Sequence, residues 1–472
     1  MFLVFIQNSA FPNFGIMSIS ALLKAHGHKT ALLITSLEKD LKGKLKKLKP
    51  DIVGFHLITG EHNKTLSLVR EIKVALGVKT LLGGPHATYY PEETINKEGV
   101  DFLAVGEAEY AVLDLLDALT KGYDTSKIKN IWSVSGKEVF KNEPRELIGS
   151  LDDLPSPDRD VYYNYSFLGK SSVKQFLTGR GCPYECTFCS NHLLNNLYKG
   201  KGRYVRRISP SKVIEEIKAV RKKWGVRTVS FTDDVFVMSM EWLNEFLPVF
   251  KKEINLPFMC NVRVNLVTEE LISKLKDHGC YGVAMGIESG NEHLRNVVLK
   301  KHLSNVQIKK ACSIIKNYKV KLKAFNMIGI PGETFEQAME TLLLNIEVQP
   351  DFTPVSLLEP YPKYEITKYA IEQGCLPTSY SVDDVSESIY IPSKLIFKDN
   401  DVQKMINLQT FFFLTVKVPI LLPLVRKLVN IKPNWFYRLT AKAVYGYFMS
   451  RMHRLTIRDI IRYAKNIDAN QV

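Results

Sequence analysis

The chain has 472 residues, 45% hydrophobic and 24% charged, which is long enough for two or three globular domains with full cores. Lysine and arginine exceed aspartate and glutamate by 64 − 49 = 15, but no nucleic-acid-binding motif accompanies this surplus, so we expect no nucleic-acid partner. The seven cysteines lack the spacing of a secreted disulfide framework, and residues 1–6 lack a basic leader, so we expect a reducing, cytoplasmic location.

Residues 1–120 alternate short apolar runs with amphipathic segments, the pattern of buried parallel strands joined by helices. This alternation predicts a doubly wound, Rossmann-like or flavodoxin-like α/β domain. Its ligand is expected beyond the carboxyl ends of the strands. The expected strands are 2–6, 30–34, 52–57, 80–82 and 102–105, and the expected helices are 16–25, 37–48, 64–76, 91–98 and 110–119.

A second α/β region follows a hairpin at 129–141 and a proline- and aspartate-rich stretch at 151–158 that reads as a linker. Six strands alternating with helices predict a partial (β/α)6 barrel, whose functional residues should lie at the carboxyl ends of its strands. The expected strands are 173–177, 228–231, 258–262, 282–287, 323–328 and 353–358, and the expected helices are 213–224, 269–278, 306–318 and 335–347.

Cys182, Cys186 and Cys189 form a C-x3-C-x2-C pattern directly after the first strand of the barrel. A structural zinc site takes four ligands, and no fourth cysteine follows at finger or ribbon spacing. His192 lies too close in sequence to bend back easily. A [4Fe–4S] cluster normally takes four thiolates, so three would leave one iron open to an outside ligand. The pattern therefore favours an iron–sulfur cluster over a zinc site or a disulfide.

The cysteine spacing, Phe188 before the last cysteine and the leading segment Arg180-Gly-Cys-Pro183 resemble the radical S-adenosylmethionine (SAM) superfamily. The resemblance implies that the open iron binds SAM and that an electron from the cluster cleaves SAM to a 5′-deoxyadenosyl radical. Three strand ends (232–234, 285–290 and 326–334) also match this family in order and spacing. The residues expected to contact SAM are Phe188, Asp233, Arg263, Glu288, Ser289, Gly329, Pro331, Gly332 and Glu333.

The loops at 83–88 and 105–109, placed ahead of the cysteine motif, resemble the cobalamin-binding domain of one radical SAM subfamily. Residues 8–13 lack the histidine with which other cobalamin proteins ligate cobalt, so we expect no protein imidazole below the metal. His56 and His86 are more typical of polar loop or core histidines. The residues expected at cobalamin are Thr59, Gly83, Gly84, Pro85, His86, Gly106 and Glu107.

The resemblance implies an enzyme that methylates an unactivated carbon, using a [4Fe–4S] cluster, SAM and cobalamin. Two alternatives stay open: radical chemistry without methyl transfer, such as oxidative ring closure, and a non-enzymatic iron–sulfur or cobalamin carrier. Methylthiolation of tRNA is disfavoured because no cysteine precedes Cys182. The expected organisation is a cobalamin-binding domain at 1–145, a linker at 146–170, a radical SAM barrel at 171–385 and a helical region at 386–472.

The stretch at 408–430 is strongly apolar, but Lys417, Pro419 and Pro423 interrupt it, which disfavours a membrane-spanning helix. It fits either a cap packed on the barrel or a segment lying on a membrane surface. The expected partners are a small-molecule substrate, with a lipid or isoprenoid as one option, and an electron donor such as ferredoxin or flavodoxin.

Overall fold

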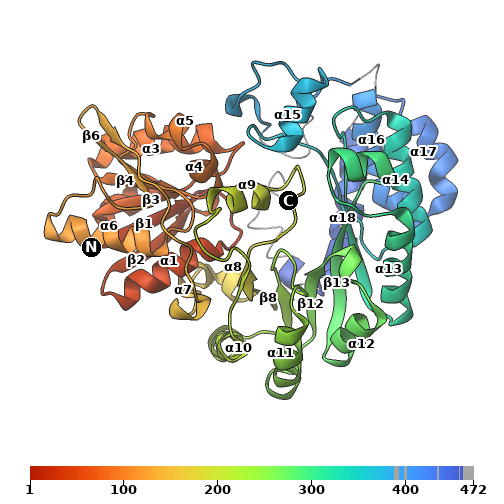
Figure 1. Ribbon diagram of the computed structural model, residues 1–472, viewed down its shortest axis with the longest axis horizontal. Helices are drawn as coiled ribbons and strands as arrows, with labels where there is room; N and C mark the ends of the chain where they lie inside the picture. The colour runs from red at the N-terminus through yellow and green to blue at the C-terminus, as the bar shows by residue number, and fades with distance from the viewer. Residues whose placement is uncertain (387–392, 398–400, 433–434, 457, 461–472) are drawn as a thin grey trace. The chain divides into compact units, whose positions relative to one another are not determined.

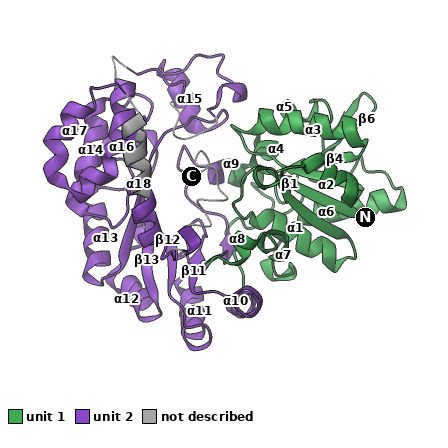
Figure 2. Ribbon diagram, turned by 180° about the vertical axis from the view of Figure 1, so that it is seen from behind, with its two compact units in different colours: residues 1–171, 193–208, 461–472 green, residues 172–192, 209–460 purple. Residues whose placement is uncertain are grey.

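The computed structural model describes residues 1–386, 393–397, 401–432, 435–456 and 458–460, so the expected helical region at 386–472 lies partly outside the described residues. The chain divides into two compact units (Figure 2). Of the described residues, 1–171 and 193–208 form unit 1, and the others form unit 2.

The sheet of unit 1 has the strand order β2-β1-β3-β4-β5-β6-β7. Its first five strands are parallel, and β6 and β7 add an antiparallel hairpin at one edge. The order 2-1-3-4-5 is the flavodoxin-like doubly wound order and confirms the predicted fold class. The strands are β1 (Phe2–Gln7), β2 (Lys29–Ile34), β3 (Ile52–His56), β4 (Lys79–Gly83), β5 (Phe102–Ala104), β6 (Ile131–Ser135) and β7 (Glu138–Phe140).

Helices cover both faces of this sheet because its strands are apolar on both sides. One face packs on the second to fifth helices through buried side chains such as Val53 and Phe55. The first and sixth helices contact each other. The helices are α1 (Phe14–Ala25), α2 (Leu41–Leu48), α3 (His62–Leu76), α4 (Pro85–Tyr89), α5 (Pro91–Ile95) and α6 (Glu109–Lys121), followed by α7 (Asp160–Tyr163) and α8 (Ser166–Gly169). Most of α9 (Ser190–Leu197) and the short strand β10 (Arg206–Arg207) also belong to this unit.

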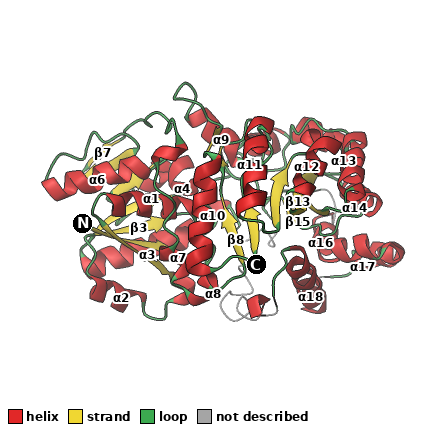
Figure 3. Ribbon diagram, turned by 90° about the horizontal axis from the view of Figure 1, so that it is seen from below, coloured by secondary structure: helices red, strands yellow, loops and turns green. Residues whose placement is uncertain are grey.

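Unit 2 is built on six parallel strands in sequential order, β15-β14-β13-β12-β11-β8. Helices connect the strands, so that the sheet curls into the predicted partial barrel (Figures 1 and 3). The strands are β8 (Val173–Phe176), β11 (Thr228–Phe231), β12 (Phe258–Val262), β13 (Cys280–Glu288), β14 (Lys321–Ile328) and β15 (Val355–Leu357). The connecting helices are α10 (Pro210–Trp224), α11 (Met240–Glu253), α12 (Glu269–Asp277), α13 (Asn305–Asn317) and α14 (Phe335–Val348).

Helix α11 is missing from the sequence-based expectation. Pro248 lies inside it, and an interior proline normally argues against a helix. The helix nevertheless forms because Trp242, Phe246 and Phe250 lie one turn apart on one face. There Phe246 meets Phe231 edge-on, Phe250 meets Phe258 edge-on, and Trp242 stacks on Phe246.

The C-terminal region is helical where it is described. Helix α16 (Asp401–Lys417) packs on α14 and β15, and its Leu408, Phe412 and Val416 are fully buried there. Helices α15 (Glu365–Glu372), α17 (Leu422–Leu428) and α18 (Trp435–Met452) complete the unit. Among the described residues, no helix is both long and apolar enough to cross a membrane.

Candidate functional site

The loop that carries the three cysteines follows β8, and hydrogen bonds and packing fix it both before the first thiol and between the last two. Before them, the buried carboxylate of Asp233 accepts hydrogen bonds from the backbone N–H (3.1 Å) and the hydroxyl (2.7 Å) of Thr178. Between them, the Thr187 hydroxyl donates to the Val298 carbonyl (2.7 Å), and Phe188 packs against the apolar cluster that contains Val298. Asp233 therefore positions the loop, and its contact with SAM stays a prediction.

The three thiols lie within electrostatic reach of one another, but their surroundings differ. Burial raises the pKa of Cys182 to about 11 and also raises the pKa of the other two thiols. Only at Cys186 do the positive charges of Lys301 and Arg263 oppose this effect of burial, so that they reduce the rise in its pKa. Cys186 therefore has the electropositive setting that favours a thiolate ligand.

Three thiolates are a donor set that fits a [4Fe–4S] cluster with one open iron. As the side chains stand, no group of three or more His, Cys, Asp or Glu residues in the described part of the chain is arranged to hold a metal ion.

Glu288 ends β13 in a left-handed conformation, with φ = 68°. The strand register also shifts between Gly286 and Glu288, which turns the carboxylate at the strand end. Lys301 Nζ donates to Glu288 Oε1 (2.7 Å) and to the Gly286 carbonyl (2.8 Å), and both charged side chains are buried. A non-glycine residue held at positive φ costs about 1–3 kcal/mol, so the surrounding bonds must impose this geometry.

Arg263 lies against the cysteine loop. Its guanidinium carbon stands 3.7 Å from the centre of the Tyr184 ring, which lies between the first two cysteines. The same guanidinium donates to the Lys301 carbonyl and to the Asn265 side chain. Arg263 and Lys301 thus place two cations beside Cys186, the arrangement that an anionic ligand such as a carboxylate requires.

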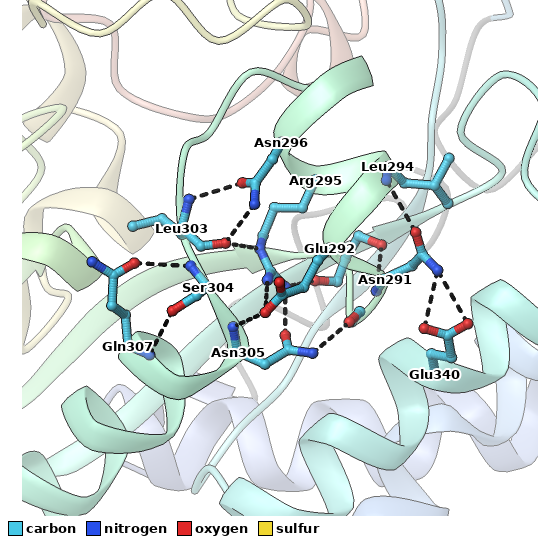
Figure 4. Close-up of polar contacts among 12 residues, drawn as sticks. Asn291, Glu292, Leu294, Arg295, Asn296, Leu303, Ser304, Asn305, Gln307 and Glu340 are labelled. Carbon is cyan, nitrogen blue, oxygen red and sulfur yellow. Dashed lines mark hydrogen bonds and ion pairs between the residues drawn. The ribbon is translucent and has the colours of Figure 1, made fainter.

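The segment after Glu288 is organised by a fully buried arginine (Figure 4). Arg295 donates to the carbonyls of Ser289 (2.6 Å) and Leu303 (2.8 Å) and to the Asn305 side chain (2.8 Å). It lies in a single π-helical turn, Leu294–Val298, a feature that is frequent at functional sites. Gly290 has no room for a side chain, because a Cβ there would overlap the Glu340 backbone.

The loop after β14 folds back on its own glutamate. Glu333 Oε2 accepts hydrogen bonds from the backbone N–H groups of Gly329 (2.5 Å) and Ile330 (3.1 Å). Glu333 Oε1 is buried and has no hydrogen-bond partner among the described residues. Burial raises the pKa of this carboxyl to about 8, although the two N–H groups act in the opposite direction. The backbone of Gly329, Pro331 and Gly332 is thereby held around a neutral acid at pH 7.

In unit 1, Gly84 and His56 occupy neighbouring strand ends. Gly84 has φ = 101°, and a Cβ there would lie 2.8 Å from His56 Cδ2 and 2.9 Å from the Leu57 carbonyl oxygen. The Asn13 amide oxygen accepts from Ile16 N–H, so its nitrogen faces His56 Nε2 (3.0 Å). His56 Nδ1 is left buried without a partner among the described residues, and burial lowers the pKa of this histidine to about 4. This orphaned N–H is a donor that suits a polar ligand group, whereas the ring atoms nearest Gly84 are Cδ2 and Nε2.

His86 follows Gly84 and Pro85 and is a core histidine. It is 1% exposed, its ring stacks on His62 at 4.3 Å, and its Nδ1 lies 3.0 Å from the Thr59 hydroxyl. A side chain at Gly84 would meet the His56 ring and the Leu57 carbonyl oxygen before it reached a ligand.

Gly106 and Glu107 lie in the loop after β5, and side chains from residues 193–208 contact both of them. The Tyr198 hydroxyl accepts from Glu107 N–H (2.6 Å), and a Cβ at Gly106 would overlap that hydroxyl. The Glu107 carboxylate pairs with both terminal nitrogens of the buried Arg206. These contacts hold the loop in shape, and cobalamin contacts for its residues stay a prediction.

Three partners were overlooked in the sequence. Lys301 lies thirteen residues after Glu288 and pairs with its carboxylate. A lysine shortly after a motif with a buried carboxylate was the only hint of this pair in the sequence. Arg206 and Tyr198 lie outside any motif, and only the folded chain reveals them.

Two family models match the chain. The B12 binding domain model matches residues 8–116, and the Radical SAM superfamily model matches residues 176–344. The chain is 29% identical over 348 residues to an uncharacterized methyltransferase of Pyrococcus horikoshii, covering 72% of this chain and 73% of that protein. It is 26% identical over 372 residues to the anaerobic magnesium-protoporphyrin IX monomethyl ester cyclase of Rubrivivax gelatinosus, covering 74% of this chain and 65% of that protein.

Among solved structures, the chain is similar to the radical SAM methyltransferase TsrM of Kitasatospora setae with cobalamin and a [4Fe–4S] cluster bound. The TM-score is 0.64 at 17% identity, covering 79% of this chain and 74% of that chain. At this identity the similarity shows that the fold is shared.

The raised pKa of Glu333 makes stability depend on pH. In the unfolded chain this carboxyl ionises near its ordinary pKa, whereas in the folded chain it stays neutral up to about pH 8. The free energy of unfolding should therefore fall as pH rises from about 5 to about 8, by on the order of a few kcal/mol. Glu333→Gln cannot ionise and should remove this part of the pH dependence in thermal unfolding.

Glu336→Gln is the matched control, because Glu336 is an exposed carboxylate in the first turn of α14, three residues after Glu333. It should retain the wild-type pH dependence. An unchanged pH dependence in Glu333→Gln would contradict the raised pKa.

Proposed function

Since the chain belongs to the radical SAM enzymes that carry a B12-binding domain, we propose that it methylates an unactivated carbon atom of a small molecule. The observation that carries the proposal is the match to both domain models in one chain, together with three cysteines in the loop after β8. The 29% identical relative that is named a methyltransferase supports methyl transfer over the other outcomes.

The proposed cofactors are a [4Fe–4S] cluster, SAM and cobalamin, which together would supply an electron, radical chemistry and a methyl group. The chain's own task is to hold them in place and exclude water. Cys182, Cys186 and Cys189 would hold the cluster. The proposed SAM residues are Phe188, Asp233, Arg263, Glu288, Ser289, Gly329, Pro331, Gly332 and Glu333, and the proposed cobalamin residues are Thr59, Gly83, Gly84, Pro85, His86, Gly106 and Glu107.

The predicted domain boundaries, at 145, 170 and 385, are kept as part of this proposal. The proposal also includes a cytoplasmic location, an electron donor of the ferredoxin or flavodoxin class and a membrane contact through 408–430. The cyclase relative, at 26% identity, favours a second candidate function, which is radical ring closure without methyl transfer.

The products formed from SAM separate these functions. Anaerobically reconstituted protein with cobalamin, SAM and a reductant should form 5′-deoxyadenosine, S-adenosylhomocysteine and a methylated compound when it turns over its substrate. A cyclase would form 5′-deoxyadenosine without S-adenosylhomocysteine, and a carrier would form neither. Chromatography of the quenched reaction measures all three.

The cluster prediction concerns the seven cysteines. Cys182→Ala, Cys186→Ala and Cys189→Ala should each abolish the cluster, because each removes one of only three proposed protein ligands. Iron and sulfide analysis measures the outcome. The four remaining cysteines are buried in the core, so alanine at Cys260, Cys280, Cys312 or Cys375 should leave cluster content unchanged. Full cluster content in any of the first three variants would contradict the assignment.

The SAM prediction concerns Glu288. Glu288→Ala should weaken SAM binding by about 2–4 kcal/mol, because it removes two hydrogen bonds to a charged acceptor, while the cluster absorbance stays in place. The variant also leaves Lys301 unpaired, so Glu288→Gln is needed as a control that keeps an acceptor for Lys301. It should bind SAM with intermediate affinity. An unchanged dissociation constant in both variants would place the contact elsewhere.

A further inference from the structure

Residues 418–432, around helix α17, expose several large aliphatic side chains. The exposed fractions are 39% for Val418, 85% for Ile420, 50% for Leu424 and 48% for Ile431. Figures 1, 2 and 3 all draw α17 at the periphery of unit 2. We name these four residues together with Lys427 and Lys432 the α17 surface.

The exposed residues are the outer stripe of an amphipathic segment. Val425 and Val429 are buried, and Leu421, Leu422 and Leu428 pack beside them against the cluster built on α14 and α16. Leu424 and Lys427 lie three residues apart on the exposed side of α17. Ile420, in the 3-10 turn before the helix, and Ile431, after its end, extend the exposed aliphatic surface. Other residues of the segment therefore form its contact with the core, and the residues of the α17 surface are not needed for that contact.

The charge of this segment has one sign. Residues 417–432 contain four basic residues and no acidic residue. Lys417 turns inward to the Pro350 carbonyl (2.6 Å), and Arg426 lies 3.6 Å from Glu336. Lys427 and Lys432 are exposed and have no ion-pair partner in the described part of the chain. Two uncompensated cations thus flank the aliphatic residues.

We propose that the α17 surface docks the enzyme on an anionic phospholipid bilayer. Aliphatic side chains can enter the boundary between headgroups and acyl chains, while neighbouring lysines meet anionic headgroups. Protein–protein interfaces are instead enriched in aromatic residues, methionine and arginine and depleted in lysine, and the α17 surface has the opposite composition. The inference is independent of the proposed methyl transfer, because binding is measured without turnover.

The structure also narrows the expected membrane contact at 408–430. The buried face of α16 puts Leu408, Phe412 and Val416 in the core, so this half of the apolar stretch is the cap on the barrel. Only residues from 418 onward keep aliphatic side chains for a bilayer. The two interpretations of the stretch thus apply to its two halves.

The test is co-sedimentation of the whole reconstituted protein with vesicles. Vesicles of phosphatidylcholine and phosphatidylglycerol in equal amounts should bind the wild type, and high salt or phosphatidylcholine alone should reduce binding. The pair Ile420→Asp and Leu424→Asp should bind at least about tenfold more weakly, because it removes apolar contact and adds repulsion. The pair Lys427→Glu and Lys432→Glu should also lose at least about tenfold in binding.

The controls change the same residue types elsewhere in unit 2. Val306→Asp alters an isolated exposed valine on α13 (75% exposed), and the pair Lys251→Glu and Lys252→Glu alters exposed lysines on α11. Both should bind vesicles like the wild type. Iron content and thermal unfolding verify the fold, and serine replaces aspartate at 420 and 424 if the first pair unfolds.

Three results would overturn the proposal. The first is a wild type that does not sediment with anionic vesicles. The second is equal vesicle binding by the wild type and the 420/424 pair. The third is a dimer in solution, detected by sedimentation velocity, that the same pair converts to a monomer without any vesicle binding. That result would assign the surface to a second copy of the chain.

Discussion

The buried ion pair between Glu288 and Lys301 is the contact on which the organisation of the candidate SAM site depends. Lys301 fixes the carboxylate at the end of β13, its own carbonyl accepts from Arg263, and both cations oppose the burial that raises the pKa of Cys186. The charges of the cysteine loop, of Arg263 and of the Glu288–Lys301 pair therefore act on one another. A buried charge that loses its partner is expensive, so a change in any one of these residues should also affect the other two.

Much of the fold was predictable because parallel strands buried on both faces leave a strong apolar signal. The strand ends 285–290 and 326–334 were predictable for the same reason, because each motif directly follows an apolar run that marks a buried strand. The partners of these motifs were not predictable. Lys301, Arg295 and Arg206 are single charged residues without a local pattern, and the hydrogen bonds and ion pairs that fix them form only in the folded chain.

The C-terminal stretch shows the same limit from the opposite direction. The apolar run at 408–430 is uniform in composition, so sequence alone could not separate a cap from a membrane-facing segment. In the structure, Leu408, Phe412 and Val416 of α16 are buried, whereas Ile420 and Leu424, after α16 ends at Lys417, are exposed. Position relative to a neighbouring helix, rather than hydrophobicity, decides which side chains remain available.

The path of the chain after the cysteines bears on how its domains can be separated. Residues 172–192 belong to unit 2, but 193–208 belong to unit 1, where Tyr198 and Arg206 complete the Gly106–Glu107 loop. A fragment ending at residue 145 would leave the Glu107 carboxylate without its arginine and the Gly106 turn without its phenol. The N-terminal domain is thus contiguous in its strands but not in the side chains that shape its proposed cobalamin loop. The Gly106–Glu107 loop therefore depends on residues 193–208, a segment that begins four residues after Cys189.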